Sequence, residues 1–370
     1  MRPTSCTIDL DAIESNVRNL AALVAPTPVC AVVKANAYGH GAVQSARAAI
    51  AGGATWLAVA LVEEGVELRA GGITVPILVL SEPPPNAMAI AIAHDLTTTV
   101  YSDAGIEAIA DAARTAGIVA DVHLGVDSGM RRVGVELDEI GSFGAKVSAS
   151  GHLNLAAVWT HCPVADEPNN PFTADQLERF GEAVAHQVPG LALHVANSAA
   201  SITGQGSLAG EPLMVRLGIS IYGINPDEAL AGMVDLSPAL TLHSEVSFVK
   251  SIRAGEAVGY GHRWTALSDT TIATVPIGYA DGVRQDLGLS GGNVLIGGKP
   301  YPIVGVVTMD QLMVDVGNGP DVESISVGSE VVLIGRQGAA ERSATDVAAT
   351  LGTIPYEVVC AISNRVRREI

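Results

Sequence analysis

Lys34 is the residue of this sequence best placed to do chemistry. The chain has four lysines, and this one alone ends an apolar run, residues 29–33. A short apolar run of this kind indicates a buried strand. A lysine where a strand leaves the core is partly desolvated, which frees its amine for Schiff-base chemistry with a carbonyl compound. A structural lysine paired with a carboxylate would explain the same placement, so position alone leaves both interpretations open.

The pattern of apolar runs to which Lys34 belongs predicts a barrel. Through the first two-thirds of the chain, eight short apolar runs alternate with Ala-rich helical patterns. Eight βα repeats over roughly 200–250 residues are typical of a (β/α)8 TIM barrel, whose active site lies at the carboxyl ends of the strands. We expect Lys34 to lie at that end. The expected strands are residues 29–34, 56–61, 76–81, 96–101, 120–126, 154–161, 191–196 and 213–219, and expected helices include 11–24, 43–51, 104–116 and 173–186.

The pattern changes near residue 236, where alternating strand patterns with Gly-rich turns replace the helical stretches. This texture is typical of a mostly β domain. We therefore predict an α/β chain with an N-terminal TIM barrel over residues 1–230 and a C-terminal mostly-β domain over 231–370. The first few residues could pack with the β domain. Expected strands here are residues 240–253, 270–276, 293–296, 301–306, 311–316 and 327–334, with one helix at 343–351.

Composition narrows the class of protein. The net charge of −18 argues against nucleic acid and anionic membranes as partners. Four widely separated cysteines show no metal-ligand spacing, so we expect free thiols in a reducing compartment and no metal. The N-terminus has no apolar signal core, and no apolar run approaches the ~20 residues of a membrane span. We predict a cytoplasmic protein.

The surroundings of Lys34 carry a specific motif. Residues 31–41, AVVKANAYGHG, resemble the pyridoxal-phosphate lysine signature of the alanine racemase family. The resemblance extends along nearly the whole chain. It includes residues 8–12, 126–130 with Arg132, 160–161, 197–200, 215–219, 222–223, 259–261, 277–282, 309–311, 355–358, 362–363 and 365–367.

The resemblance implies a racemase that interconverts L-alanine and D-alanine through a pyridoxal 5′-phosphate aldimine on Lys34, supplying D-alanine for peptidoglycan. Racemisation removes a proton from one face of Cα and returns it on the other, which two opposed bases do simply. The resemblance assigns the proton of the D-enantiomer to Lys34 and that of the L-enantiomer to Tyr260. Without the family, Tyr260 would be interpreted as an exposed turn residue between two glycines.

Further residues are assigned to the cofactor. Gly218 and Ile219 follow the last expected barrel strand, where this fold often binds phosphate. The resemblance implies that Ser198, Tyr38 and Tyr356 complete the phosphate site. On the sequence alone, Ser198 could instead cap a helix, and the two tyrosines could be amphipathic core residues.

Arg216 lies in an apolar run and, if buried, needs partners. In the family this arginine faces the pyridine nitrogen. Because arginine does not readily give up its proton, the nitrogen would stay neutral, which weakens the electron sink and should suppress transamination. We expect His194 to support Arg216, with His161 and Asn197 nearby. Each histidine could equally be a satisfied core residue.

The substrate side of the site is implied by resemblance alone. Tyr260 falls in the β domain although Lys34 is in the barrel, and in the family this tyrosine comes from the partner subunit of a head-to-tail homodimer. The resemblance also implies that Tyr279 and Met309 of one subunit reach the site of the partner subunit, and that Asp310 is a supporting residue there. The backbone NH of Met309 and the side chain of Arg132 would bind the substrate carboxylate.

One position departs from the family. Many members carry a lysine, often carbamylated, that orients the arginine equivalent to Arg132, and here Gly125 stands in its place. Another anion or carboxylate would have to hold Arg132. Three other functions are alternatives: a racemase of broader specificity, for example for serine; a related pyridoxal-phosphate decarboxylase; and a non-catalytic cofactor-binding protein. Substrate breadth depends on pocket shape near Tyr356 and Met309.

Overall fold

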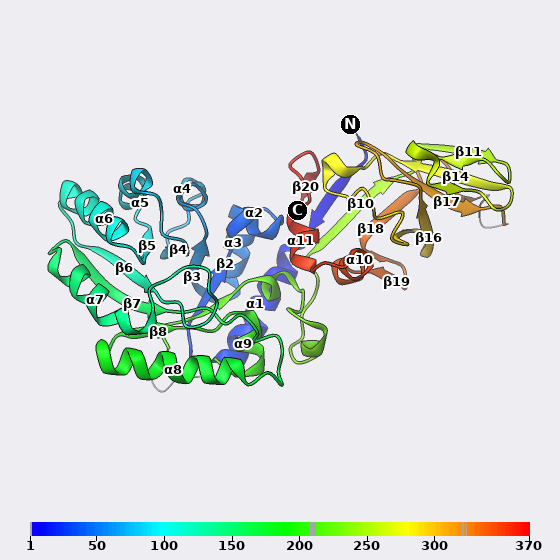
Figure 1. The fold of residues 1–370 in the computed structure, drawn as a ribbon. Helices are drawn as coiled ribbons and strands as arrows, with labels where there is room; N and C mark the ends of the chain where they lie inside the picture. The colour runs from blue at the N-terminus through cyan, green and yellow to red at the C-terminus, as the bar shows by residue number, and fades with distance from the viewer. Residues whose placement is uncertain (1, 207–211, 320–321, 323) are drawn as a thin grey trace. The chain divides into compact units, whose positions relative to one another are not determined.

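The computed structural model describes residues 2–206, 212–319, 322 and 324–370 (Figure 1). The chain divides into two compact units. The barrel unit comprises Leu10–Ala37 and Gly41–Ser237. The β unit comprises Met1–Asp9, Tyr38–His40 and Pro238–Ile370.

The barrel unit contains a parallel sheet in the order β9-β2-β3-β4-β5-β6-β7-β8. The two end strands approach each other, because the backbone N–H of Leu213 donates to the carbonyl of Leu193 at 2.7 Å and that of Arg216 to Ala196 at 2.9 Å. The predicted TIM barrel is confirmed, and each expected strand overlaps an observed one. The strands are β2 (Val29–Val32), β3 (Ala54–Val59), β4 (Ile77–Val79), β5 (Thr97–Val100), β6 (Ala120–Gly125), β7 (Leu153–Trp159), β8 (Ala192–His194) and β9 (Val215–Leu217).

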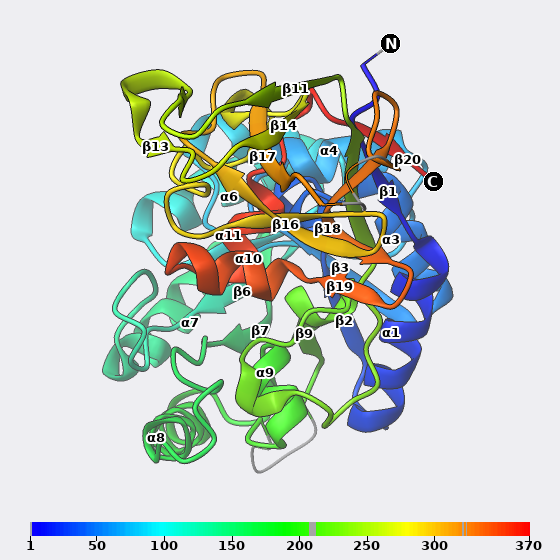
Figure 2. The same ribbon diagram turned by 90° about the vertical axis from the view of Figure 1, so that its right-hand side faces the viewer.

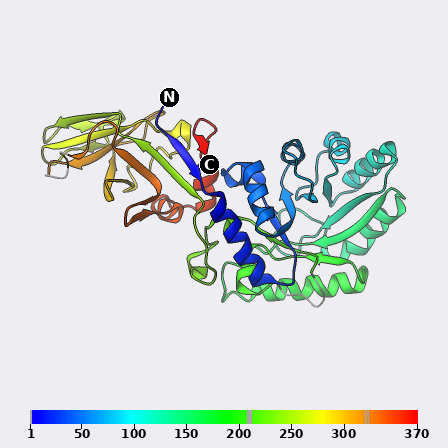
Figure 3. The ribbon, with the colours of Figure 1, turned by 180° about the vertical axis from the view of Figure 1, so that it is seen from behind.

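Helices cover the outside of the barrel (Figures 1 and 3). In α1 (Leu10–Val24), Ile13, Val17 and Leu20 are fully buried. Their spacing of four and three residues puts them on one helical face, which packs inward. The described helices that follow are α2 (Lys34–Tyr38), α3 (Ala42–Ala51), α4 (Val62–Ala70), α5 (Met88–Ala93), α6 (Asp103–Ala116), α7 (Ile140–Ala149), α8 (Phe172–Gln187) and α9 (Ser198–Thr203), with 3-10 turns η1 (Pro85–Ala87), η2 (Leu137–Glu139), η3 (Ile219–Tyr222) and η4 (Glu228–Leu230).

The β unit is built on one large sheet in the order β11-β14-β17-β16-β15-β18-β10-β1-β20, with β19 paired to β18. The N-terminal strand β1 (Ser5–Ile8) belongs here, because it pairs antiparallel with β10 and parallel with β20. The other strands are β10 (Leu240–Glu245), β11 (Phe248–Ile252), β12 (Ala257–Val258), β13 (Trp264–Thr265), β14 (Thr270–Val275), β15 (Asn293–Ile296), β16 (Lys299–Val304), β17 (Leu312–Gly317), β18 (Glu330–Gln337), β19 (Ala340–Arg342) and β20 (Arg367–Glu369).

Two features of the β unit differ from the expectation. The single strand expected at 240–253 is two strands, because β10 pairs with β18 while β11 pairs with β14. Besides α10 (Ala344–Leu351), which Ser343 caps and which lies near β18 (Figure 2), there is a second helix, α11 (Pro355–Cys360). The unit also has 3-10 turns η5 (Tyr260–His262) and η6 (Tyr279–Asp281).

The four cysteines are free thiols, as expected; Cys6, Cys30 and Cys162 are buried and Cys360 is exposed. Among the described helices, none has the length and apolar character needed to cross a bilayer. No cluster of three or more His, Cys, Asp or Glu side chains suited to a metal ion occurs in the described part of the chain.

Candidate active site

Several of the expected polar residues of the barrel unit follow the carboxyl ends of its strands. Lys34 follows β2, Arg132 follows β6, His161 follows β7, and Arg216 lies within β9. Lys34, Arg132 and Arg216 all act electrostatically on His161. Burial and these three cations lower the pKa of His161 to about 3, so the imidazole is neutral at physiological pH. The barrel mouth is therefore a cationic site around a neutral histidine.

Lys34 opens a strained turn. The residues after it, Ala35 to Tyr38, all have φ between 52° and 54°, in the left-handed region, although none is glycine. Each such residue costs roughly 1 kcal/mol or more. The turn must therefore be held by specific hydrogen bonds, and it sets the direction in which Lys34 leaves the strand.

Glu64, which the sequence pattern did not single out, is one of these anchors. Its Oε1 accepts the backbone N–H of Ala35 at 2.6 Å, while Oε2 accepts those of Ala60 and Leu61 at 2.8 and 3.1 Å. One carboxylate thus ties the turn after β2 to the end of β3. On the other side of the turn, Oδ1 of Asn36 accepts the N–H of Ala42 at 2.8 Å.

Arg216 is buried, with 4 % of its surface exposed, and its hydrogen-bond partners are neutral. Its guanidinium donates to Nδ1 and the carbonyl of His194, both at 2.8 Å, and to Nδ1 of His161 at 3.3 Å. The carbonyls of Thr160 and Val195 accept at 2.8 and 3.1 Å. Burial without a carboxylate lowers the pKa of Arg216 to about 10, which still leaves it charged at neutral pH.

Another histidine, His123, forms a hydrogen bond with His194. Because Nδ1 of His194 accepts from Arg216, its proton resides on Nε2, which lies 3.0 Å from Nδ1 of His123. Burial, Arg216 and His123 together keep the pKa of His194 well below 6.5. The sequence pattern did not single out His123 either, although it lies on β6 two residues before Gly125, where side chains share one face of the strand.

Ser198 and Gly218 lie side by side at the mouth of the barrel. The Oγ of Ser198 accepts the N–H of Gly218 at 2.8 Å, and the hydroxyl of Ser220 donates to the same oxygen at 2.9 Å. The helix-cap interpretation of Ser198 is wrong, because the cap of α9 is Asn197, whose Oδ1 accepts from Ala200. Ile219 begins the buried turn η3.

Gly125 ends β6 in a crowded place. A Cβ on this residue would lie 3.1 Å from Cγ2 of Thr99, 3.3 Å from Cδ1 of Tyr101 and 3.7 Å from Cε2 of Trp159. Neighbouring side chains therefore use the space that a larger residue would need. Arg132 is exposed and lies close enough to Tyr101 to lower its pKa electrostatically, although burial of Tyr101 outweighs this and raises it.

The remaining expected residues belong to the β unit. Tyr260, Tyr279 and Met309 are exposed, at 76, 43 and 51 % of their surface. Tyr279 and Met309 lie on paired loops, since the N–H of Tyr279 donates to Thr308 and that of Ala280 to Met309. These loops are anchored by ion pairs. Arg2 binds Asp281 at 2.8 Å, and Arg365 binds Asp310 at 2.7 Å.

Tyr38 and Tyr356 are neighbours within the β unit, with ring centroids 6.1 Å apart and planes at 51°. Tyr38 is buried, and burial together with Tyr356 and Cys360 raises its pKa above the ordinary value. Its hydroxyl is therefore protonated and can donate a hydrogen bond.

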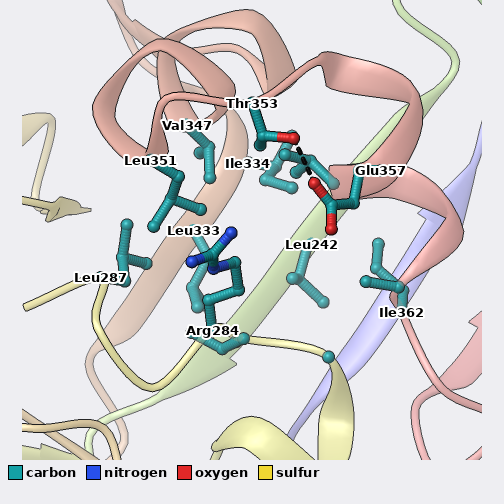
Figure 4. Close-up of a pocket in the computed structure, with 14 residues that line it drawn as sticks. Leu242, Arg284, Leu287, Leu333, Ile334, Val347, Leu351, Thr353, Glu357 and Ile362 are labelled. Atoms are coloured by element: carbon teal, nitrogen blue, oxygen red, sulfur yellow. Dashed lines mark hydrogen bonds between the residues drawn. The ribbon is translucent and has the colours of Figure 1, made fainter.

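A separate pocket lies between β10, β18, α10, α11 and the loop after η6 (Figure 4). Apolar residues, among them four leucines and two isoleucines, line most of it, and its polar groups are Arg284 and the hydrogen-bonded pair Thr353 and Glu357. None of the residues predicted for the site lines this pocket.

The chain thus combines a parallel (β/α)8 barrel, which carries a lysine and two arginines in or after its strands, with a mostly-β unit that exposes tyrosines; this is the architecture of a two-domain barrel protein. Comparison with known families gives a finer assignment. The model of the alanine racemase N-terminal domain matches residues 8–226, and that of the alanine racemase C-terminal domain matches residues 239–370. This chain belongs to the alanine racemase family, a family of isomerases, and the resemblance drawn from the lysine motif is confirmed.

Individual relatives agree along the full length. An alanine racemase of Symbiobacterium thermophilum is 44 % identical, with 100 % of this chain and 97 % of the relative covered. Alanine racemase 1 of Bacillus subtilis is 42 % identical, covering 99 % and 92 %. The crystal structure of alanine racemase from E. faecalis has a TM-score of 0.91 at 38 % identity, covering 100 % and 98 %. That from Bartonella henselae, with covalently bound pyridoxal phosphate, has a TM-score of 0.89 at 28 % identity, covering 100 % and 99 %.

Proposed function

We propose that this chain is a pyridoxal-phosphate-dependent racemase that interconverts L-alanine and D-alanine and supplies D-alanine for peptidoglycan in the cytoplasm. The observation that carries the proposal is the convergence of Lys34, Arg132 and Arg216 on a neutral His161 at the barrel mouth. Membership of the alanine racemase family supports the choice of substrate.

The residues present fit the cofactor. A ligand with a phosphate and a second negative charge would balance the cations at the barrel mouth, among which Arg216 has only neutral hydrogen-bond partners in the described part of the chain. Lys34 would hold the carbonyl carbon, and Ser198, Gly218, Ile219, Tyr38 and Tyr356 would supply donors to the phosphate. When bound, pyridoxal phosphate supplies an electron-withdrawing ring system that acidifies the Cα–H of an amino acid.

Arg216 favours racemisation over the alternatives. Its guanidinium is a pure donor and stays charged, so it would offer a hydrogen bond to a ring nitrogen without transferring a proton. A related decarboxylase would need a carboxylate at this position. The neutral partners of Arg216 are consistent with a group that keeps its own proton.

Two bases would handle the proton at Cα. Lys34 would take or return it on one face and Tyr260 on the other. We propose that Tyr260, Tyr279 and Met309 act on the site of a second copy in a homodimer, which accords with their exposure in the single chain. The backbone N–H of Met309 and the side chain of Arg132 would bind the substrate carboxylate.

The proposal is tested by incubating the purified protein with pyridoxal phosphate and a panel of L-amino acids, with chiral detection of the products. We expect D-alanine to form fastest. If serine or another amino acid is racemised faster, the alanine assignment fails and a racemase of broader specificity replaces it. Release of CO2 without racemisation would favour the decarboxylase.

A further inference from the structure

Trp159, the last residue of β7, is a buried aromatic beside the candidate site that no step above uses. It has 6 % of its surface exposed. The Cζ of Arg216 lies 4.9 Å from the centroid of the indole ring, within the range of a cation–π contact. The same ring stacks on His194, with centroids 5.8 Å apart and planes at 13°.

The indole therefore contacts both members of the pair formed by Arg216 and His194. Hydrogen bonds hold the edges of the guanidinium and the imidazole, and the indole ring lies against both groups. A buried guanidinium usually has an anion to hold it, whereas the hydrogen-bond partners of Arg216 are carbonyls and imidazole nitrogens. The negative face of an indole is the best uncharged substitute among aromatic rings.

We propose that Trp159 is a positioning residue for Arg216: its indole face holds the guanidinium in place of a carboxylate and keeps His194 in the orientation in which Nδ1 accepts from Arg216. This role keeps the arginine charged and fixed without an acidic neighbour that could supply a proton. It rests on the proposed function, because positioning Arg216 matters to the reaction only if the arginine faces the cofactor.

The packing around Gly125 is a second observation that supports this role of Trp159. The backbone of Gly125 on the neighbouring strand β6 leaves room for Tyr101 and Trp159, since a Cβ there would come within ordinary contact of the indole at 3.7 Å and closer still to Tyr101. The indole therefore occupies space beside Gly125 that a side chain at that position would restrict.

The first test uses apoprotein labelled with 15N-histidine and two variants, Trp159→Leu and Trp159→Phe. Nitrogen chemical shifts in the wild-type protein should show His194 protonated on Nε2 alone. Trp159→Leu should mix the two tautomers, while Trp159→Phe, which keeps an aromatic face, should largely preserve the wild-type signal. An unchanged His194 signal in Trp159→Leu would overturn the proposal.

The second test uses the holoenzyme and measures transamination relative to racemisation of alanine. Loss of a desolvated cation–π contact should raise this ratio about tenfold in Trp159→Leu, with a smaller rise in Trp159→Phe. Should Trp159→Leu fail to fold, Trp159→Met, which keeps bulk without an aromatic face, takes its place, and a wild-type ratio in that variant would contradict the proposal.

Phe180→Leu is the matched control. Phe180 is fully buried in α8 and takes no part in the described hydrogen bonds or ring contacts of Arg216 and His194. It should leave the His194 tautomer and the reaction ratio unchanged; equal effects from Phe180→Leu and Trp159→Leu would mean general loss of packing and overturn the specific role. If the wild-type protein racemises nothing, the proposed function fails, while the histidine spectra still decide whether Trp159 orients His194.

Discussion

Arg216 donates a hydrogen bond of 2.8 Å to Nδ1 of His194, and this contact determines which nitrogen of His194 carries its proton. Nε2 of His194 then donates to His123, whose own Nε2 is buried and has no hydrogen-bond partner among the described residues. Arg216 sets the donor-to-acceptor direction of this series of hydrogen bonds, because an arginine side chain can only donate hydrogen bonds. Two neutral imidazoles therefore lie behind a charged guanidinium.

This arrangement predicts a loss of stability in mild acid. Burial lowers the pKa of His123 from 6.5 to about 4, so the unfolded chain takes up a proton at a pH where the folded chain does not. The stability is fully present above pH 6.5 and falls as the pH drops toward 4. Between pH 6.5 and 5, His123 alone should cost about 2 kcal/mol of unfolding free energy.

Urea unfolding at the two pH values would measure this effect. His123→Asn removes the titrating group and should flatten the dependence by that amount, even if it lowers stability overall. His152→Asn, at a partly exposed position outside the barrel interior, is the control and should keep the wild-type slope. An unchanged slope in His123→Asn would contradict the account of a buried neutral histidine.

Lys34→Ala should abolish both cofactor attachment and racemisation, because no other described lysine follows a barrel strand. The visible absorbance of bound pyridoxal phosphate and the chiral assay report the two losses separately. Lys146→Ala, which removes a surface ion pair with Asp103, should change neither by more than about twofold. Full activity in Lys34→Ala would refute the assignment.

Tyr260→Phe should impair the reaction that starts from L-alanine more than the exchange that starts from D-alanine. The phenol is exposed in the single chain, so its removal should leave the fold intact. Solvent deuterium incorporation into Cα, followed separately for each enantiomer, measures the asymmetry. Tyr301→Phe, elsewhere in the β unit, is the control; equal loss of exchange from both enantiomers of alanine in Tyr260→Phe would argue against the two-base assignment.

Glu64→Gln should weaken cofactor binding and lower stability by about 1–2 kcal/mol, because an amide nitrogen cannot accept the backbone N–H bonds that one carboxylate oxygen now receives. The left-handed turn after Lys34 would lose its anchor. Thermal unfolding of the apoprotein and titration with pyridoxal phosphate measure the two effects. Glu63→Gln, its exposed neighbour, should behave as wild type; if both variants bind the cofactor equally well, Glu64 does not position the turn.

The sequence by itself was sufficient to predict the barrel and to place Lys34 at the end of its first strand. Apolar runs at regular spacing identify parallel strands, and the carboxyl ends of parallel strands meet at one mouth, so the spacing alone places Lys34, His161 and Arg216 together. The alternation also marked the β unit. This alternation did not reveal that β10 and β11 are separate strands. The apolar–polar period of two continues from one strand into the next, although β10 pairs with β18 and β11 pairs with β14.

The tertiary structure alone decided what holds these groups. Glu64 reaches Ala35 from 29 residues away, and Trp159 reaches Arg216 from a different strand. Such contacts depend on which side chains the barrel brings face to face, which no local period encodes. The tautomers of His194 and His123 likewise follow from the direction of hydrogen bonds in a buried cluster. The motif around Lys34 is local in the chain, whereas the network that orients its surroundings exists only in the folded barrel.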